Sequence, residues 1–399
     1  MLERILPFLL LLLVLPDLYI SLHLLKMKRH RLVWRLAWWI PSLALAILGV
    51  LLAAGDEFTP DRLAETGQYL VWYFVVTIPK CLFTLCSLVG WGVQALCKAR
   101  RNYGNYAGGV LAAAGFYMML AGATFDRGNY RVREVTYTSP DIPKAFDGYR
   151  IVQFSDLHVG TFRRGHECDV QTIVNLVNTQ KGDVIVFTGD LVNHRAEELE
   201  GFESQLSRLK APDGVYSIMG NHDYSMYIHW PTKEAHEQAI RRIQDKERSF
   251  GWRLLLNERV MLHRGNDSIA LLGSENDGYR HHFPRRGNVP KMLAGIEGLR
   301  GDTVKRPKLF KVLLSHDPTQ WRKKILPQTD IQLMLSGHTH GMQFELFGFS
   351  PAEWLYPEWG GMYTSGNQSL YVSLGVGEVM VPFRFGALPE INVITLKRK

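Results

Sequence analysis

Hydrophobic positions are distributed differently in the first 125 residues and in the rest of the chain. Four long apolar runs, at residues 5–25, 36–54, 69–96 and 107–125, fill the first part. A helix needs roughly 20 apolar residues to cross a bilayer, and each run is close to that length or longer. The pattern therefore predicts a four-helix transmembrane region over residues 1–125.

The first run has a competing interpretation as a cleaved signal peptide. Its apolar stretch is longer than the core of a signal peptide, it starts with Glu3 and Arg4, and further apolar runs follow it. We therefore expect a transmembrane helix. Lys80 lies within the third run. A charge at that depth is a candidate functional residue, but snorkelling or pairing with another helix explains it equally well, so we assign it no catalytic role.

The charges of the connecting loops predict an orientation. Basic residues gather in the first connection, around residues 26–35, and in the third, at 98–101, whereas the second connection, 55–67, is acidic. Because basic loops stay in the cytoplasm, both ends of the helical region are expected outside, with the remainder of the chain extracytoplasmic on a plasma (inner) membrane. Three arginines at 127, 131 and 133 weaken this inference.

Beyond residue 125, short strand-like runs alternate with amphipathic helical stretches, which is typical of an α/β domain. Residues 126–147 are expected to form a connector and a first strand, and residues 148–399 a catalytic domain. Helices are predicted at 166–178, 197–209 and 232–250. Strands are predicted at 131–138, 151–155, 183–188, 215–219, 252–256, 260–264, 268–273, 308–314 and 331–335.

Charge and cysteine content narrow the function little. Residues 1–125 carry 11 Lys and Arg against 6 Asp and Glu, so most of the net charge of +8 comes from the apolar region. This basicity is poor evidence for nucleic-acid binding, which needs a clustered basic face. Of the four cysteines, only Cys168 lies beyond the apolar region. The second part therefore cannot form an internal disulfide.

Residues that can bind metals follow five of the predicted strands. Single examples, such as a polar turn at Gly220-Asn221-His222-Asp223, are commonplace. Their repetition is not, because the carboxyl ends of strands in an α/β sheet meet where ligands bind. In an extended segment, residues two apart also point the same way. The five sets are Asp156/His158, Asp190, Asn221/His222/Asp223, His316 and His338/His340.

The order of the five sets, and the glycines that precede three of them, resemble the motifs of the calcineurin-like metallophosphoesterase superfamily. The matching blocks are Asp156-x-His158, Gly189-Asp190, Gly220-Asn221-His222-Asp223, His316 and Gly337-His338-x-His340. The closing segment, with Pro382-x-Arg384 and Pro389-Glu390, resembles the bacterial membrane-associated branch. The resemblance covers roughly residues 148–396 and implies a two-sheet α/β/β/α sandwich. It says nothing about the role of the four helices.

The resemblance also implies a two-metal centre. Asp190 would bridge the ions, with Asp156, His158 and His340 on one and Asn221, His316 and His338 on the other. Imidazole ligands disfavour Mg²⁺ and Ca²⁺ and favour Mn²⁺, Fe or Zn²⁺, and Mn²⁺ is our first choice. A hydroxide bridging the two ions would attack phosphorus.

His222 is the expected general acid for the leaving group. Asp223 would either orient the His222 imidazole or simply close the turn, and the sequence leaves both roles open.

The substrate is less clear from the sequence. Residues 276–288 form a basic loop, with Arg280, His281 and His282 among its residues, that could hold phosphate but is more simply a solvated face. Residues 346–362 are rich in Phe, Trp, Tyr and Pro, as expected either of ordinary packing or of an apolar lip that touches lipid. We expect a phosphodiester or pyrophosphate bond to be cleaved, with a lipid-linked envelope molecule as one option and an unassigned oligomeric state.

Three alternatives remain open at this stage. The first is an enzyme that resembles the hydrolases that cleave UDP-diacylglucosamine. That reaction would need a cytoplasmic site, and the loop charges predict the opposite orientation. The second is a non-catalytic receptor or scaffold, against which the complete ligand set argues. The third is a transporter with an appended domain, and four helices without an evident internal repeat give it little support.

Overall fold

The computed structural model describes residues 2–23, 32–54, 60–163, 165–280, 283–301 and 309–399. The basic residues at 26–31, the acidic pair at 56–57 and the two histidines at 281–282 lie outside these ranges. The chain forms two compact units. One contains Met1–Asp126 with Met380–Phe385, and the other contains Arg127–Val379 with Gly386–Lys399.

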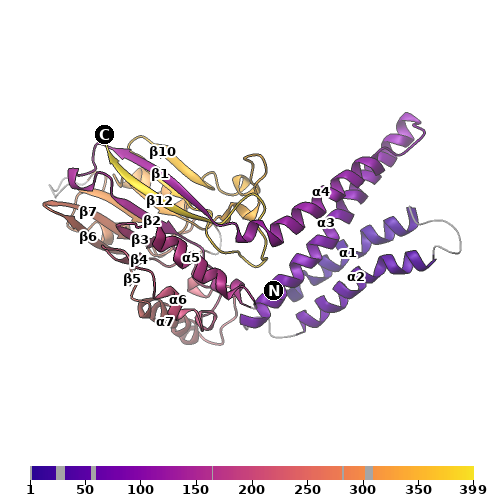
Figure 1. Ribbon diagram of the computed structural model, residues 1–399, viewed down its shortest axis with the longest axis horizontal. Helices are drawn as coiled ribbons and strands as arrows, with labels where there is room; N and C mark the ends of the chain where they lie inside the picture. Colours follow the sequence, from indigo (N-terminus) through magenta and orange to yellow (C-terminus); the bar gives the residue numbers. More distant parts are fainter. Residues whose placement is uncertain (1, 24–31, 55–59, 164, 281–282, 302–308) are drawn as a thin grey trace. The chain divides into compact units, whose positions relative to one another are not determined.

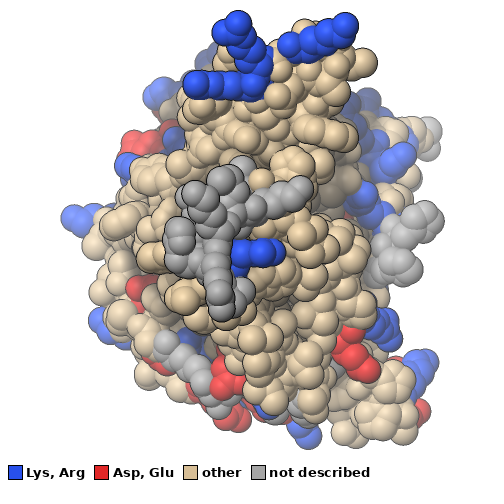
Figure 2. Space-filling model, turned by 90° about the vertical axis from the view of Figure 1, so that its right-hand side faces the viewer, with Lys and Arg blue, Asp and Glu red and all other residues tan. Residues whose placement is uncertain are grey.

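The first unit is helical and confirms the four predicted apolar helices (Figure 1). They are α1 (Leu2–His23), α2 (Leu32–Ala53), α3 (Pro60–Cys97) and α4 (Gly104–Thr124). Helix α3 begins nine residues before the predicted run, because the polar turn ahead of that run is also helical. Large apolar side chains such as Leu11, Val33 and Trp72 are exposed on these helices, as expected of residues that face lipid. Figure 2 shows a face that is mostly uncharged, with Lys and Arg gathered at its upper edge.

Small residues let α3 and α4 approach closely. At Gly104 a Cβ would lie 2.1 Å from the carbonyl oxygen of Cys86, so no larger residue fits at this crossing. The connection between the two helices carries Lys98, Arg100 and Arg101.

Lys80 has a charged partner within the helical unit. Its Nζ lies 2.8 Å from Oδ1 of Asp17 on α1, whose side chain is fully buried. The same Nζ donates to Oγ of Ser42 on α2 over 2.8 Å, and that hydroxyl donates to Asp17. The ring of Trp38 lies 5.1 Å from the ammonium. Of the explanations the sequence offered for Lys80, pairing with another helix is therefore the one observed.

Six residues from near the carboxyl terminus also belong to the helical unit. Within Met380–Phe385, Val381 and Phe383 pack against apolar side chains of the helices. The backbone N–H of Arg384 donates to the carbonyl of Gly122 over 3.0 Å. The sequence pattern assigned these residues to the catalytic domain, and only their tertiary contacts reveal where they pack.

The second unit contains two six-stranded mixed sheets. In the first sheet, β2, β3, β4 and β5 are parallel, β12 is antiparallel to β2, and β1 is parallel to β12. The strand order is β1 (Arg131–Ser139), β12 (Glu390–Arg398), β2 (Arg150–Phe154), β3 (Val184–Phe187), β4 (Val215–Ser217) and β5 (Arg253–Leu254).

In the second sheet, β11, β9, β8 and β7 are parallel, and β10 and β6 are antiparallel edges. The strand order is β10 (Gly361–Ser365), β11 (Gln368–Val372), β9 (Leu333–Ser336), β8 (Phe310–Leu314), β7 (Asp267–Gly273) and β6 (Glu258–Arg264).

Three apolar cores hold the layers together. Ile151 and Val186 of the first sheet pack with Val312 and Leu335 of the second, forming a core between the sheets. The first sheet's outer face packs on α5 (Glu167–Thr179), α6 (Glu203–Leu206) and α7 (Lys233–Ser249). The second sheet's outer face packs on α8 (Val289–Met292) and the helical residues around Trp321. The predicted four-layer α/β/β/α sandwich is confirmed.

One predicted helix is wrong in extent. Residues 197–209 were expected to form a single helix, but the structure contains a 3₁₀ turn at Ala196–Leu199 and the single helical turn α6. Gly201, at φ +89°, separates them, because a residue in the left-handed region cannot continue an α-helix.

Candidate metal centre

Five strand ends in the second unit deliver the predicted site residues. Asp156 and His158 follow β2, Asp190 follows β3, and Asn221 and His222 follow β4. His316 follows β8, and His338 and His340 follow β9. Within each sheet these strands are parallel. Their carboxyl ends therefore share one edge of their sheet, and the two edges lie together.

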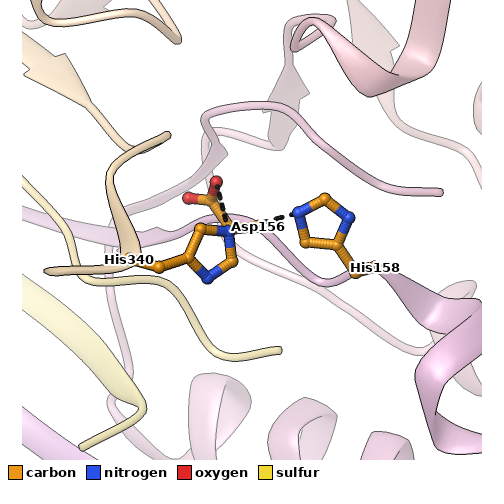
Figure 3. A group of neighbouring side chains, drawn as sticks. All are labelled: Asp156, His158 and His340. Carbon is orange, nitrogen blue, oxygen red and sulfur yellow. Dashed lines mark hydrogen bonds and ion pairs between the residues drawn. The ribbon is translucent and has the colours of Figure 1, made fainter. Parts of the chain in front are cut away.

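Asp156, His158 and His340 form the first group of potential ligands (Figure 3). Nε2 of His340 lies 3.2 Å from Oδ1 of Asp156 and 3.2 Å from Nε2 of His158. All three residues are buried.

Asn221, His316 and His338 form a second group. Nε2 of His316 lies 3.1 Å from Oδ1 of Asn221 and 3.2 Å from Nδ1 of His338.

Asp190 lies between the two groups. Its Oδ2 is 3.1 Å from Nε2 of His316 in the second group and 3.5 Å from Nε2 of His158 in the first. A carboxylate within reach of both sets of donors is suitably placed to bridge two cations.

The electrostatics of this cluster fit cations. Burial and then the neighbouring His222 hold the pKa of His158 well below its usual range, so this imidazole stays neutral with a lone pair to donate. Burial lowers the pKa of His316, but Asp190 and Asp156 outweigh burial and raise it to about 10. The carboxylates thus favour positive charge at the centre of the cluster. Imidazoles, an amide oxygen and buried carboxylates together are a donor set for Mn²⁺, Fe or Zn²⁺.

Backbone strain is concentrated at the same positions. Five of the seven predicted ligands adopt a positive φ, from +46° at His158 to +79° at His338. The left-handed region is rarely occupied by residues other than glycine, and such outliers cluster at functional sites. Besides His158 and His338, the ligands with a positive φ are Asp156, Asp190 and His340.

Gly220 and Asp223 shape the loops around Asp190. A Cβ on Gly220 would lie 2.1 Å from Oδ1 of Asp190, so only glycine permits this approach. Asp223 accepts backbone hydrogen bonds from Asp190 (2.8 Å), Leu191 (2.9 Å), Val192 (3.1 Å) and Gly220 (2.9 Å). Burial and then the Asp190 carboxylate raise the pKa of Asp223, while the backbone N–H bonds oppose the rise.

His222 is oriented by a backbone carbonyl. Its Nδ1 lies 2.8 Å from the carbonyl oxygen of Asn193, and its backbone N–H donates to Oδ1 of Asp190 over 2.9 Å. Within the described ranges, no hydrogen bond joins Asp223 to the His222 ring. Of the two roles considered for Asp223, the contacts therefore match the closing of the turn, and Asn193 orients the imidazole.

Two tyrosines that the sequence argument missed contact predicted ligands. The Tyr227 hydroxyl accepts from Nδ2 of Asn221 over 2.5 Å, and its ring centroid lies 4.4 Å from that of His222. The Tyr356 hydroxyl lies 2.9 Å from Nε2 of His338. Neither tyrosine follows a strand directly, so no strand-end pattern could have found them.

His194 was also missed, although it follows Asp190 by only four residues. Its ring centroid lies 6.1 Å from that of His222. Burial and then His222 lower the pKa of His194 to about 3, so a neutral imidazole lies beside the candidate acid. The sequence did contain a signal for His194, because it lies in the same loop after β3 as Asp190.

The basic loop at 276–288 places Arg280 beside the site. Its guanidinium lies 5.3 Å from the ring centroid of Tyr356, and its Nη1 donates to the carbonyl of Leu355 over 2.9 Å. Arg285 and Arg286 instead lie over Tyr279 and Tyr224. Arg285 and Arg286 are also exposed, as expected of a solvated face, whereas Arg280 is only partly exposed.

Family models match both parts of the chain. A model described as calcineurin-like phosphoesterase matches residues 149–342. A model described as probable calcineurin-like phosphoesterase, transmembrane domain, matches residues 3–127.

Named relatives agree with these matches. The chain is 31% identical over 306 residues to the uncharacterized metallophosphoesterase YkuE of Bacillus subtilis, covering 74% of this chain and 94% of that protein. It is 30% identical over 276 residues to a transmembrane protein with metallophosphoesterase domain from Danio rerio, covering 67% of this chain and 57% of that protein. Among solved structures, the sulfate thiohydrolase SoxB of Thermus thermophilus aligns with a TM-score of 0.35 at 13% identity, covering 64% of this chain and 58% of that one.

Proposed function

Because the chain belongs to the calcineurin-like phosphoesterase family, we propose that it is a membrane-anchored, two-metal hydrolase of phosphodiester or pyrophosphate bonds. The observation that carries the proposal is the position of Asp190, whose Oδ2 lies within 3.5 Å of imidazoles from both ligand groups. In this proposal residues 1–125 anchor the protein and residues 148–399 form the catalytic domain.

Each ligand group would hold one divalent ion, with Mn²⁺ as the first choice. Asp156, His158 and His340 would hold one ion, Asn221, His316 and His338 the other, and Asp190 would bridge them. Two such ions supply an activated water and neutralise charge on the phosphoryl oxygens. The polypeptide contributes the spacing of the ligands, which its strand ends and strained backbone maintain.

His222 is proposed as the general acid. Because Nδ1 faces the carbonyl of Asn193 at 2.8 Å, Nδ1 carries the proton of that hydrogen bond. The other nitrogen, Nε2, then carries the proton that passes to the departing oxygen. Proton donation is needed when the leaving oxygen is a strong base.

We further propose that the substrate is linked to a lipid and that the catalytic domain is extracytoplasmic. The four apolar helices support the first point, since they keep the domain at a bilayer. The acidic second connection and the basic third connection support the second. Reporter fusions at the carboxyl terminus and in the second connection test the orientation, and a cytoplasmic carboxyl terminus would overturn it.

Turnover of bis-p-nitrophenyl phosphate by the purified full-length protein tests the enzymatic activity. We expect hydrolysis with added Mn²⁺, loss of hydrolysis after chelation, and recovery on adding the metal back. Asp190→Asn should lower bound metal below two ions per chain by elemental analysis. Asp147→Asn, at an exposed ion pair with Lys397, serves as the matched control. A protein that neither binds metal nor hydrolyses the diester would favour a receptor or scaffold instead.

A further inference from the structure

An exposed apolar surface follows the last two predicted ligands, and we call it the apolar rim. Its most prominent members are Phe347, which is 100% exposed, and Trp354, which is 76% exposed. Single exposed apolar residues need no explanation, but a run of them marks an interaction surface. The rim consists of Met342, Leu346, Phe347, Phe349, Trp354 and Leu355.

The backbone that carries the rim is braced. Leu346 and Phe349 exchange backbone hydrogen bonds of 2.9 and 3.1 Å, forming a tight turn with Phe347 at its tip. The buried Ser350 hydroxyl donates to the carbonyl of Gly341 over 2.6 Å. The rings of Phe349 and Trp354 pack at 5.4 Å between centroids. The exposure is therefore built into an ordered loop.

The rim and the candidate metal centre share this loop. Tyr356, two residues after Trp354, lies 2.9 Å from the predicted ligand His338. Thr339, between the two histidines, donates to the carbonyl of Trp359 over 2.5 Å. Arg280 donates to the carbonyl of Leu355, which links the rim to the guanidinium beside the site. A molecule whose apolar part contacts the rim would thus present its polar part to the metal centre.

Chain continuity points to the bilayer as the occupant of the rim. Val379 donates to Oε1 of Gln343, and the backbone of Gly386 lies against that of Glu345. Val379 and Gly386 are the two residues that immediately flank the six residues belonging to the helical unit. The loop that carries the rim therefore contacts the two residues that flank a segment packing among the apolar helices.

The residue types agree with an interfacial position. Trp is enriched where a membrane meets water, and Phe and Leu contribute apolar area below that level. Glu353 is exposed between the rim residues and Glu345 is partly exposed. Their carboxylates oppose deep insertion, so the headgroup boundary suits this loop better than the hydrocarbon core.

We propose that the apolar rim inserts into the interface of the bilayer that the four helices cross, and thereby presents membrane-resident phosphoesters to the metal centre. The insertion stands independently of catalysis. The presentation of substrate rests on the function proposed above.

Spin labels test the insertion directly. Phe347→Cys and Trp354→Cys, each in a full-length chain with its four native cysteines replaced, would carry a nitroxide in nanodiscs. We expect relaxation by oxygen, which partitions into lipid, and protection from an aqueous nickel chelate. Arg241→Cys, at an exposed position on α7, should show the opposite. Nickel access at 347 and 354 equal to that at 241 would overturn the proposal. So would protection that disappears when each nanodisc holds a single chain, because a second copy would then be the occupant.

A paired-substrate assay tests the presentation. Phe347→Ser/Trp354→Ser should hydrolyse water-soluble bis-p-nitrophenyl phosphate at the wild-type rate. On a phosphatidyl p-nitrophenyl diester in the same nanodiscs, its rate should fall at least tenfold. Equal rates of wild type and variant on the lipid diester would overturn the presentation. If the wild type hydrolyses neither compound, the proposed function fails, while the spin-label result still decides the insertion.

Discussion

The side-chain amide of Asn221 donates from Nδ2 to the hydroxyl of Tyr227 over 2.5 Å. This contact uses the nitrogen end of the amide, so Oδ1 points to the other side, where it lies 3.1 Å from Nε2 of His316. An amide has two ends of similar shape, and its partners decide which end faces a metal. Tyr227 therefore holds the nitrogen end of the amide, in the orientation in which Asn221 presents oxygen to the proposed second ion.

Removing this hydroxyl should weaken metal binding without unfolding the protein. We expect Tyr227→Phe to lower the affinity for Mn²⁺ about tenfold or more, as observed when partners of metal ligands are removed. Titration of the metal-free protein with Mn²⁺ measures the effect. Tyr137→Phe removes a hydroxyl bonded to the carbonyl of Gln332 between the sheets and is the control. Equal affinities in the two variants would contradict the role of Tyr227.

His222→Ala should slow the enzyme in proportion to the basicity of the leaving group. A p-nitrophenolate leaves without a proton, so we expect a loss of less than about tenfold on bis-p-nitrophenyl phosphate. An alkoxide needs the proton, and on alkyl diesters the loss should reach roughly 10²–10⁴-fold. A series of diesters of graded leaving-group pKa measures this dependence. A uniform loss across the series would contradict general acid catalysis by His222.

Asp223→Asn should destabilise the fold rather than imitate the loss of His222. The asparagine offers one oxygen to four backbone N–H groups that the carboxylate now satisfies. Leaving a buried donor unsatisfied costs about 1–3 kcal/mol, so we expect a lower unfolding temperature in detergent. The leaving-group dependence of the residual activity should stay as in the wild type. A dependence like that of His222→Ala would restore the orienting role for Asp223.

Glu247 makes stability depend on pH. It is fully buried on α7, and burial and then the Asp223 carboxylate raise its pKa from 4.5 to about 8. The unfolded chain ionises first as pH rises, so the wild type should lose stability between about pH 4.5 and 8. Glu247→Gln cannot ionise. The unfolding temperature of the variant minus that of the wild type should therefore increase from pH 5 to pH 8, and a constant difference would contradict the prediction.

The ion pair between Asp17 and Lys80 should be sensitive to the removal of one partner. Lys80→Met leaves a buried carboxylate alone, and breaking a buried pair costs about 3–5 kcal/mol. Asp17→Asn/Lys80→Met removes both charges and should recover most of the lost thermal stability in detergent. The double variant should also retain hydrolysis of bis-p-nitrophenyl phosphate. Loss of that activity in a stable double variant would mean that the pair serves the reaction.

The sequence by itself determined the four membrane helices and the α/β class of the second unit, because both depend on local periodicity. The two-sheet sandwich followed from the resemblance of its motifs to a known family. A bilayer demands long apolar runs, and a buried parallel strand demands a short one. It also predicted which residues would meet, such as Asp190 and His222, which follow neighbouring parallel strands of the first sheet. The carboxyl ends of neighbouring parallel strands must lie at one edge of a sheet, whatever the loops do.

Only the tertiary structure decided which groups surround those residues. Tyr227 reaches Asn221, and the carbonyl of Asn193 reaches His222, through loop conformations that no periodicity encodes. Asp17 pairs with Lys80 across 63 positions, and Met380–Phe385 pack among helices that begin the chain. Such contacts depend on how separate elements pack, whereas residue spacing reports only on neighbours within one element. The sequence therefore predicted the chemistry of the candidate site, whereas the groups that orient its residues became apparent only in the tertiary structure.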